Sequence, residues 1–163
     1  MPRSNSGDLA WSLIEPSPRR FNYGMMTTVY VIDGMGGGIG AQIVQRIRKD
    51  IKVECALAAL ATNAVAAQRM VDAGASRGAS GENAFRVCLS DADFALGPLG
   101  IVLPNSMMGE LTPAMAEAVF ASRAKKILLP LAQSHLSIVG LADRNVGELI
   151  GEAVAVLASA LEV

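Results

Sequence analysis

Five of the seven residues from 34 to 40 are glycine, and they separate a strand-like segment from a helix-like one. The segment before them, 27–33, reads TTVYVID, and the segment after them, 41–48, reads AQIVQRIR. Glycine lets the backbone turn sharply and lets a ligand approach it, while the free N–H groups at a helix start attract anions. The loop therefore predicts a site for a small phosphate-bearing ligand. Its expected contacts are Gly34, Gly36, Gly37, Gly38, Ile39 and Gly40.

Two dinucleotide patterns fit this loop. Gly36-x-Gly38-x-x-Ala41 matches the dinucleotide fingerprint, and Gly34-x-x-x-Gly38-x-Gly40 resembles the loop of short-chain dehydrogenases. The fingerprint also expects an acid about 20 residues further on, at the end of the second strand, to bind the ribose hydroxyls. Thr62 and Asn63 stand there instead, and they can bond a ribose less selectively or accommodate the phosphate of NADP. The loop thus predicts NAD(P) or another nucleotide, and the alternative is a turn that only packs a helix against a sheet.

Asp33 ends the strand-like segment beside the expected phosphate. A carboxylate there repels a phosphate unless it bonds a hydroxyl, stays protonated or shares a Mg²⁺ ion with the ligand. The alternative is a turn aspartate that accepts N–H bonds from the glycine loop. Asp33 is therefore a candidate ligand contact and Mg²⁺ a candidate ion, while no dedicated metal site is predicted.

Further candidates follow other expected strands or begin expected helices, which places them at the same edge of the fold. They are Thr62, Asn63, Glu82, Asn83, Gly97, Pro98 and Glu110. If their loops fold over the glycine loop, Asn63, Glu82, Asn83 and Glu110 form a polar rim that orients a ligand. Because a helix start stabilises a carboxylate, the alternative role of the two glutamates is helix capping.

The signatures of several enzyme classes are missing. Neither Tyr23 nor Tyr30 has the lysine four residues on that short-chain dehydrogenases use, and no Gly-Lys-Ser/Thr follows the glycines as in phosphate-transferring loops. The one histidine, His135, has no Gly-x-Ser-x-Gly partner motif. The sequence predicts a ligand class and leaves any reaction open.

Strand-like and helix-like segments alternate along the chain. Strands are expected at 27–33, 51–57, 92–96, 127–130 and 136–140; helices are expected at 39–48, 62–74, 80–89, 112–123 and 145–161. Strands separated by helices imply parallel pairing with right-handed crossovers. The expected fold is α/β, a three-layer Rossmann-like arrangement of a mostly parallel, twisted sheet with helices on both faces. Such sheets bind ligands at the carboxyl ends of their strands, where the glycine loop lies.

Length and charge limit the possible partners. The 163 residues suit one domain, 26–163, preceded by a polar, proline-interrupted extension, 1–25, expected to be flexible or loosely docked. Fourteen basic and 15 acidic residues give a net charge of −1, so neither nucleic acid nor a membrane surface is an expected partner. No apolar stretch is long enough to span a membrane and no signal peptide is evident, which predicts a cytoplasmic protein.

The apolar share is high, at 52 % hydrophobic against 18 % charged residues. Self-association would bury the excess of apolar surface, so we expect a homo-oligomer in which the final helix, 145–161, forms the contact. An alternative function follows from the same observation: an oligomeric interaction or scaffold module with a purely structural glycine loop.

Several separate blocks of the sequence resemble one family, the bacterial domain-of-unknown-function family 3842. The blocks are VIDGMGGGIG at 31–40, Thr62-Asn63, GASGEN at 78–83, GPLGI at 97–101 and GELTPAMA at 109–116. The resemblance covers nearly everything after Met26, and the chain departs from the family pattern at Ala61, where the family has glycine, and in its long amino-terminal arm. The resemblance implies a Rossmann-like fold and a shared site, and it implies no reaction.

Overall fold

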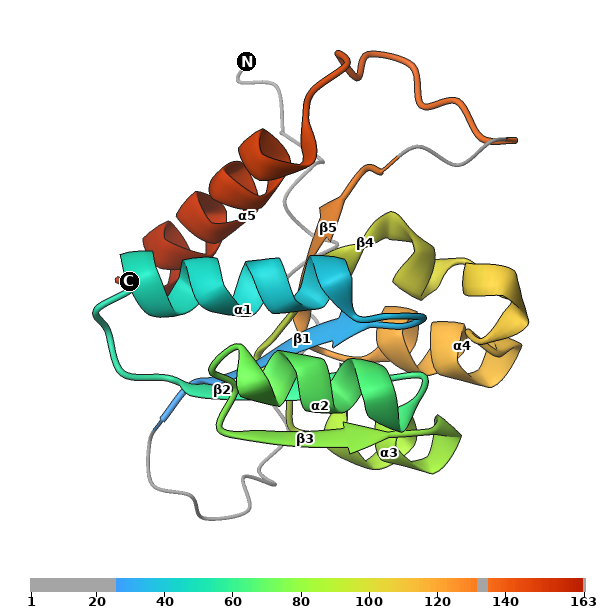
Figure 1. Cartoon of the computed structure of the whole chain (residues 1–163), viewed down its shortest axis with the longest axis horizontal. Coiled ribbons are helices and arrows are strands. Elements are labelled where there is room, and N and C mark those ends of the chain that lie inside the picture. The colour runs from blue at the N-terminus through green and yellow to red at the C-terminus, as the bar shows by residue number, and fades with distance from the viewer. Residues whose placement is uncertain (1–25, 132–134, 163) are drawn as a thin grey trace, which may run out of the picture.

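The computed structural model describes residues 26–131 and 135–162, so the predicted extension 1–25 lies outside the described residues. Strands and helices alternate, as Figure 1 shows. The elements are β1 (Thr28–Asp33), α1 (Gly38–Asp50), β2 (Ala56–Ala61), α2 (Ala64–Asp72), β3 (Arg77–Ser80), α3 (Glu82–Cys88), β4 (Phe94–Pro98), the 3-10 turns η1 (Leu99–Val102) and η2 (Met107–Gly109), α4 (Pro113–Ala121), β5 (Lys125–Leu129) and α5 (Val146–Leu161).

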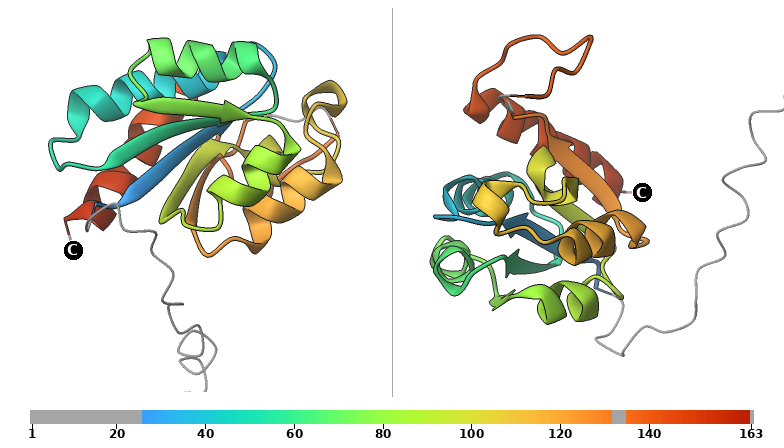
Figure 2. Two further views of the ribbon diagram at one scale, coloured as in Figure 1. Left: turned by 90° about the horizontal axis from the view of Figure 1, so that it is seen from below. Right: turned by 90° about the vertical axis from the view of Figure 1, so that its right-hand side faces the viewer.

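The five strands form a parallel sheet in the order β3-β2-β1-β4-β5. Alternate residues of β1 face opposite sides: Val29 and Val31 pack with α1, α2 and α5, while Tyr30 and Ile32 pack with α3, η1 and α4. Burial on both faces explains why β1 is a continuous apolar run. Figure 2 shows the sheet between the two helical layers, which confirms the three-layer Rossmann-like fold.

The second strand was predicted in the wrong place. It was expected at 51–57, but β2 covers Ala56–Ala61, and Val53 in the expected strand is 45 % exposed. The alternation of Ile51, Val53 and Cys55 imitates a half-buried strand, whereas the true strand reads ALAALA and is buried on both faces. Alanine has low strand propensity, so the true strand carried no local signal.

Two further predictions were wrong at the margins of the sheet. Arg77–Ser80 forms the edge strand β3, although its sequence RGAS has no apolar pattern, and Gly81 rather than Ser80 precedes α3 as its cap. The strand expected at 136–140 is not part of the sheet, and Val139 within it is 99 % exposed. A short apolar run is therefore an ambiguous signal for a strand.

Three of the predicted helix starts are confirmed by their caps. Asn63 accepts a hydrogen bond from the N–H of Ala66 at 2.9 Å, and Thr112 accepts one from the N–H of Met115 at 3.1 Å. Asn145 and Glu148 form a reciprocal capping box at the start of α5. The caps of α2 and α4 fix where the loops after β2 and η2 meet the sheet edge.

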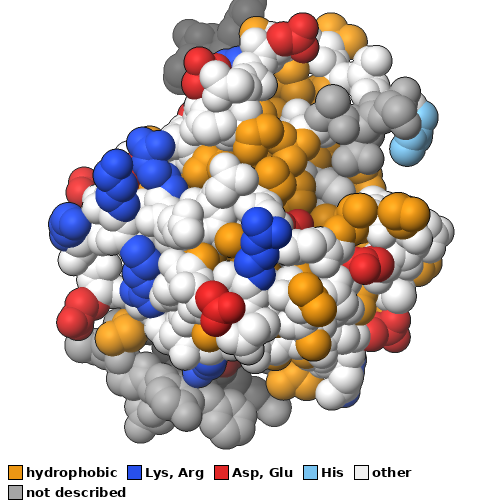
Figure 3. Space-filling model, in the orientation of Figure 1, with side chains coloured by type: hydrophobic (Ala, Val, Ile, Leu, Met, Phe, Trp, Pro, Cys, Tyr) orange, Lys and Arg blue, Asp and Glu red, His pale blue; other side chains and the backbone are white. Residues whose placement is uncertain are grey.

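The outer face of α5 bears on self-association. Leu157 is fully buried, whereas Val156 is 42 % exposed. Val156 also lines a groove of about 400 Å³ between α5 and β5, where Figure 3 shows hydrophobic side chains gathered beside α5. Self-association through α5 stays a prediction, and Val156 is the residue to substitute in a test because Leu157 belongs to the core.

Candidate functional site

The carboxyl ends of the strands bring three loops together: the glycine loop after β1, Thr62-Asn63 after β2, and the segment 103–112 after η1 (Figure 1). A cavity of about 250 Å³ opens beside the glycine loop. It is lined by Asp33, Gly34, Met35, Gly36, Gly37, Gly38, Ile39, Gln42 and Met107. The predicted loop residues therefore surround a hollow, with the exception of Gly40, which does not line it.

Asp33 is the one buried polar or charged side chain among the described residues, at 6 % exposure. Its two oxygens accept hydrogen bonds from the N–H of Gly34 at 2.8 Å and of Gly40 at 2.7 Å. Burial raises the pKa of the Asp33 carboxyl, and these N–H bonds and the charge of Arg69 oppose that rise. The geometry is that of a turn aspartate, which was the alternative to a ligand contact.

A magnesium role for Asp33 stays a prediction. No group of three or more His, Cys, Asp or Glu side chains in the described part of the chain is placed to hold a metal ion. A Mg²⁺ ion shared between a carboxylate and phosphate oxygens needs fewer protein ligands than a dedicated site.

Three glycines of the loop are required by the packing of the fold. A Cβ atom on Gly37, which has a φ of 68°, would lie 2.8 Å from Cα of Ala66. A Cβ on Gly40 would lie 2.8 Å from Cβ of Asp33, and one on Gly34 would lie 2.6 Å from the Thr62 hydroxyl oxygen. The packing alternative thus explains Gly34, Gly37 and Gly40.

The remaining two glycines, Gly36 and Gly38, are not explained by packing. Their φ angles lie outside the left-handed region, and the nearest atom to an added Cβ is Arg69 Nη1, at 3.7 Å and 3.6 Å respectively. Their backbone N–H groups also have no hydrogen-bond partner among the described residues. Two positions that are separated only by Gly37 therefore combine an open Cα with an N–H group that has no partner among the described residues.

Arg69 lies over these two open positions. It comes from the second turn of α2, and its Nη1 donates to the carbonyl oxygen of Gly36 at 3.1 Å. Sequence reasoning missed Arg69, because only the packing of α2 against α1 brings the guanidinium to the loop. Its location in a helix that starts at the carboxyl edge is the one sequence signal that could have pointed to it.

Glu110 joins the loops after β1 and β2. Its Oε2 accepts hydrogen bonds from the N–H of Met35 at 2.5 Å, the hydroxyl of Thr62 at 2.7 Å and the amide of Asn63 at 3.1 Å. These bonds, with the Thr62 hydroxyl first, hold the pKa of Glu110 below its ordinary value. The structure therefore brings together three of the predicted site residues, although they are up to 48 positions apart in the sequence.

Thr62, Asn63 and Glu110 lie beside the cavity without lining it, and the other four candidates do not line it either. Glu82 accepts a hydrogen bond from the Thr112 hydroxyl at 2.7 Å, and Asn83 accepts one from Arg86 at 2.5 Å. A Cβ on Gly97 would lie 2.3 Å from the carbonyl oxygen of Ile32, so this glycine lets β4 approach β1. Pro98 is buried at the end of β4. Of the four residues predicted to form a polar rim, only Asn63 and Glu110 meet beside the glycine loop, where they are hydrogen-bonded to each other.

Three methionines beside the cavity have left-handed backbone conformations. The φ angles are 50° for Met35, 56° for Met107 and 57° for Met108, and Met108 is 91 % exposed. Such angles cost free energy in residues other than glycine and cluster at functional sites. The thioether side chains offer an adaptable apolar surface next to the open glycines.

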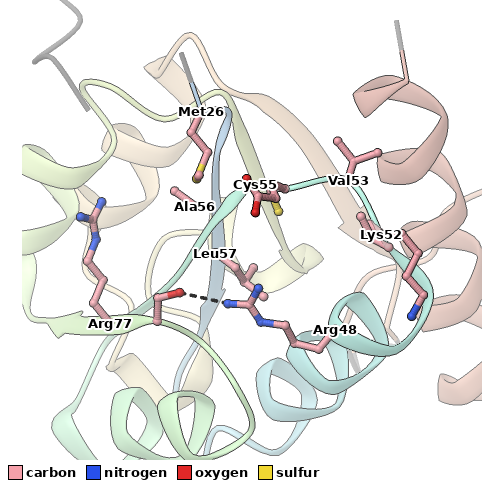
Figure 4. Close-up of a pocket in the computed structure, with 11 residues that line it drawn as sticks. Met26, Arg48, Lys52, Val53, Cys55, Ala56, Leu57 and Arg77 are labelled. Carbon is pink, nitrogen blue, oxygen red and sulfur yellow. Dashed lines mark hydrogen bonds between the residues drawn. The ribbon is translucent and has the colours of Figure 1, made fainter. Parts of the chain in front are cut away.

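A second cavity, of about 470 Å³, lies at the opposite end of the sheet (Figure 4). Arg48 lines it and donates to the carbonyl oxygen of Gly74 at 2.8 Å and to the Ser76 hydroxyl at 3.0 Å. Lys52 also lines it and donates to the carbonyl oxygen of Lys49 at 2.9 Å. No residue predicted to bind the ligand lies there.

The family model of a domain of unknown function (DUF3842) matches residues 28–162. The chain belongs to this family. The resemblance drawn from the sequence blocks is therefore confirmed, and the match begins at β1 and ends just after α5. No curated protein and no solved structure matches the chain. Among the described residues, no helix combines the length and apolarity needed to cross a membrane.

Proposed function

We propose that this DUF3842 protein binds a nucleotide or dinucleotide, with a phosphate seated against Gly36 and Gly38. One observation carries the proposal: these two glycines have open Cα positions and unpaired N–H groups, although the fold requires neither property. A phosphate oxygen can accept both N–H bonds only where no side chain intervenes. A requirement that the ligand reach the backbone at both positions explains why each of them is glycine.

The charge at this position also suits a phosphate. The guanidinium of Arg69 lies beside Gly36 and Gly38, and arginine matches the geometry of phosphate oxygens. The carboxylates of Asp33 and Glu110 are each bonded to backbone N–H groups, so part of their charge is already compensated. Arg69 does not line the cavity itself, so its charge would act on the phosphate from beside the glycine loop.

The strand order supports a nucleotide over a bare phosphate. The order β3-β2-β1-β4-β5 corresponds to the dinucleotide-binding arrangement, in which the ligand lies across the point where the order reverses at β1. The cavity of about 250 Å³ takes the phosphate and its neighbouring atoms, and the exposed methionines extend an apolar surface beyond it. The proposal covers binding and leaves the reaction open.

A melting experiment with the full chain tests the proposal. NAD, NADP, FAD, S-adenosylmethionine and ATP are added separately, and a ligand at 100 times its dissociation constant stabilises the fold by about 2.7 kcal/mol. That corresponds to a rise of several degrees in the melting temperature. If saturating amounts of every compound leave the melting temperature unchanged, the proposal fails.

A pair of glycine variants localises the binding. Gly38→Val places a side chain between the phosphate and the unpaired N–H groups, so it should remove the rise while the protein stays folded. Gly151→Val is the matched control, because this glycine of α5 also faces only an arginine, with Arg46 Nη1 3.4 Å from an added Cβ. The control should keep the full rise.

A further inference from the structure

The dinucleotide fingerprint expects a carboxylate at the end of β2, and the sequence places none there. In the folded chain, however, a carboxylate does lie at this place. Glu110, from the segment after η2, accepts hydrogen bonds from Thr62 at 2.7 Å and from Asn63 at 3.1 Å, the two residues that follow β2. A residue distant in the sequence thus occupies the position that the fingerprint assigns to a local acid.

The two oxygens of this carboxylate are used unequally. Oε2 receives three hydrogen bonds, from Met35, Thr62 and Asn63. Oε1 receives only a longer one, 3.3 Å from the Asn63 amide. A carboxylate has about four acceptor positions, so Oε1 of this exposed side chain retains capacity for further donors. Vicinal hydroxyl groups are suitable donors.

The surrounding backbone is built to hold Glu110 in this orientation. The chain turns back through Met107, Met108 and Gly109, all with positive φ, and the N–H of Asn105 closes the loop on the carbonyl oxygen of Leu111 at 2.8 Å. Gly34 leaves the necessary space, because a Cβ there would lie 3.2 Å from Glu110 Oε2. The hydrogen bonds of Glu110 thus explain both the glycine at position 34 and the positive φ angles of the turn at 107–109.

We propose that Glu110 binds the 2′,3′-diol of an adenosine ribose, so that the site selects NAD-type nucleotides over those with a 2′-phosphate. The inference rests on the proposed function. No ion pair joins Glu110 to a lysine or arginine within the described residues. A 2′-phosphate would therefore meet a carboxylate that no lysine or arginine of the described residues pairs with, and the nearby Arg69 is already bonded to the carbonyl oxygen of Gly36.

Calorimetry with the full chain tests this assignment. NAD should bind at least about tenfold more tightly than NADP, since a hydrogen bond to an ionised acceptor is stronger than one to a neutral acceptor. In Glu110→Gln the affinity for NAD should fall about tenfold and the affinity for NADP should stay or rise, which removes the preference. Glu82→Gln is the matched control, because this nearby glutamate also accepts a threonine hydroxyl, and it should keep the preference.

A measurement on the unaltered chain covers the case in which Glu110→Gln does not fold. ADP should bind about tenfold more tightly than 2′-deoxy-ADP, because the deoxy compound lacks one of the two hydroxyl donors. Equal affinities for the two compounds would overturn the assignment of Glu110.

The outcomes separate this inference from the proposed function. If NAD binds and Gly38→Val abolishes its binding, but NADP binds equally well or Glu110→Gln keeps the preference, the glycine-loop site stands and the role of Glu110 is wrong. If the chain binds only ligands that lack an adenosine diol, the role assigned to Glu110 is likewise wrong. If no nucleotide binds the unaltered chain, the proposed function fails and the inference fails with it.

Discussion

The two ends of the sheet each carry a cavity, and the smaller one is the better candidate for ligand binding. The amino-end cavity measures about 470 Å³ and is lined by Arg48, Lys52 and Arg77, whereas the carboxyl-end cavity measures about 250 Å³. At the amino end, Arg48 and Lys52 are bonded to neighbouring carbonyl groups. At the carboxyl end, the N–H groups of Gly36 and Gly38 have no partner within the described part of the chain. Unsatisfied donors with open access indicate a binding site more directly than volume does.

Helix direction explains this difference. In a parallel α/β fold every helix that follows a strand starts at the carboxyl edge, so its free N–H groups collect there. At the amino edge the helix ends expose carbonyl groups, and the basic residues Arg48 and Lys49 in the last turn of α1 complement them. Two of the basic residues that line the larger cavity, Arg48 and Lys52, therefore already have structural roles.

The largest expected effect concerns adjacent glycines of the carboxyl end. Gly37→Ala should lower the free energy of unfolding by about 2–4 kcal/mol, because its φ of 68° is strained for alanine and the Cβ would meet the backbone of Ala66. Gly38→Ala should leave stability unchanged or raise it by up to about 1 kcal/mol, since alanine favours the helix. Urea unfolding of both variants measures the contrast, and equal losses would show that the fold requires Gly38 as well.

The distinction between these glycines could not be predicted from the sequence. The strand before the loop is a continuous apolar run and the helix after it has clear periodicity, so the sequence located the loop. Which glycines face α2 and which face solvent depends on packing between α1 and α2. For the same reason Arg69 was missed, and Glu110 was foreseen only as part of a general rim, because its bonds to Met35 and Thr62 join segments far apart in the chain.

The strands at the margins of the sheet show a related limit of prediction from the sequence. Local periodicity marks an element well when one face is polar, as in α1, and poorly when burial is complete or absent. β2 is buried throughout and β3 is largely exposed, so neither alternates. The order of the strands therefore came from the structure, although the parallel sheet itself followed from the succession of strands and helices.

A smaller effect is expected at the amino end. Arg48→Ala removes the hydrogen bonds to Gly74 and Ser76, which should cost about 1 kcal/mol and lower the melting temperature by about 2–4 °C. The rise in melting temperature caused by nucleotides should be the same as in the unaltered chain. If Arg48→Ala instead abolishes that rise while the protein remains folded, the ligand binds in the larger cavity and the comparison between the two ends is reversed.

The smallest expected effect is that of pH on nucleotide preference. Hydrogen bonds to the ionised Glu110 hold its pKa below the ordinary glutamate value of about 4.3, so the carboxylate keeps its charge above that value. A lowered pKa means that the contribution of the charged form is complete above the ordinary value and is lost as the pH falls through the lowered one. After correction for protonation of the 2′-phosphate of NADP, the ratio of NAD to NADP affinity should therefore stay constant between about pH 8 and pH 5 in competition experiments. A phosphate monoester gains a proton near pH 6, so AMP serves as the reference for changes that come from the ligand. A ratio that already falls between about pH 7 and pH 5, after this correction, would show that a group other than Glu110 distinguishes the two nucleotides.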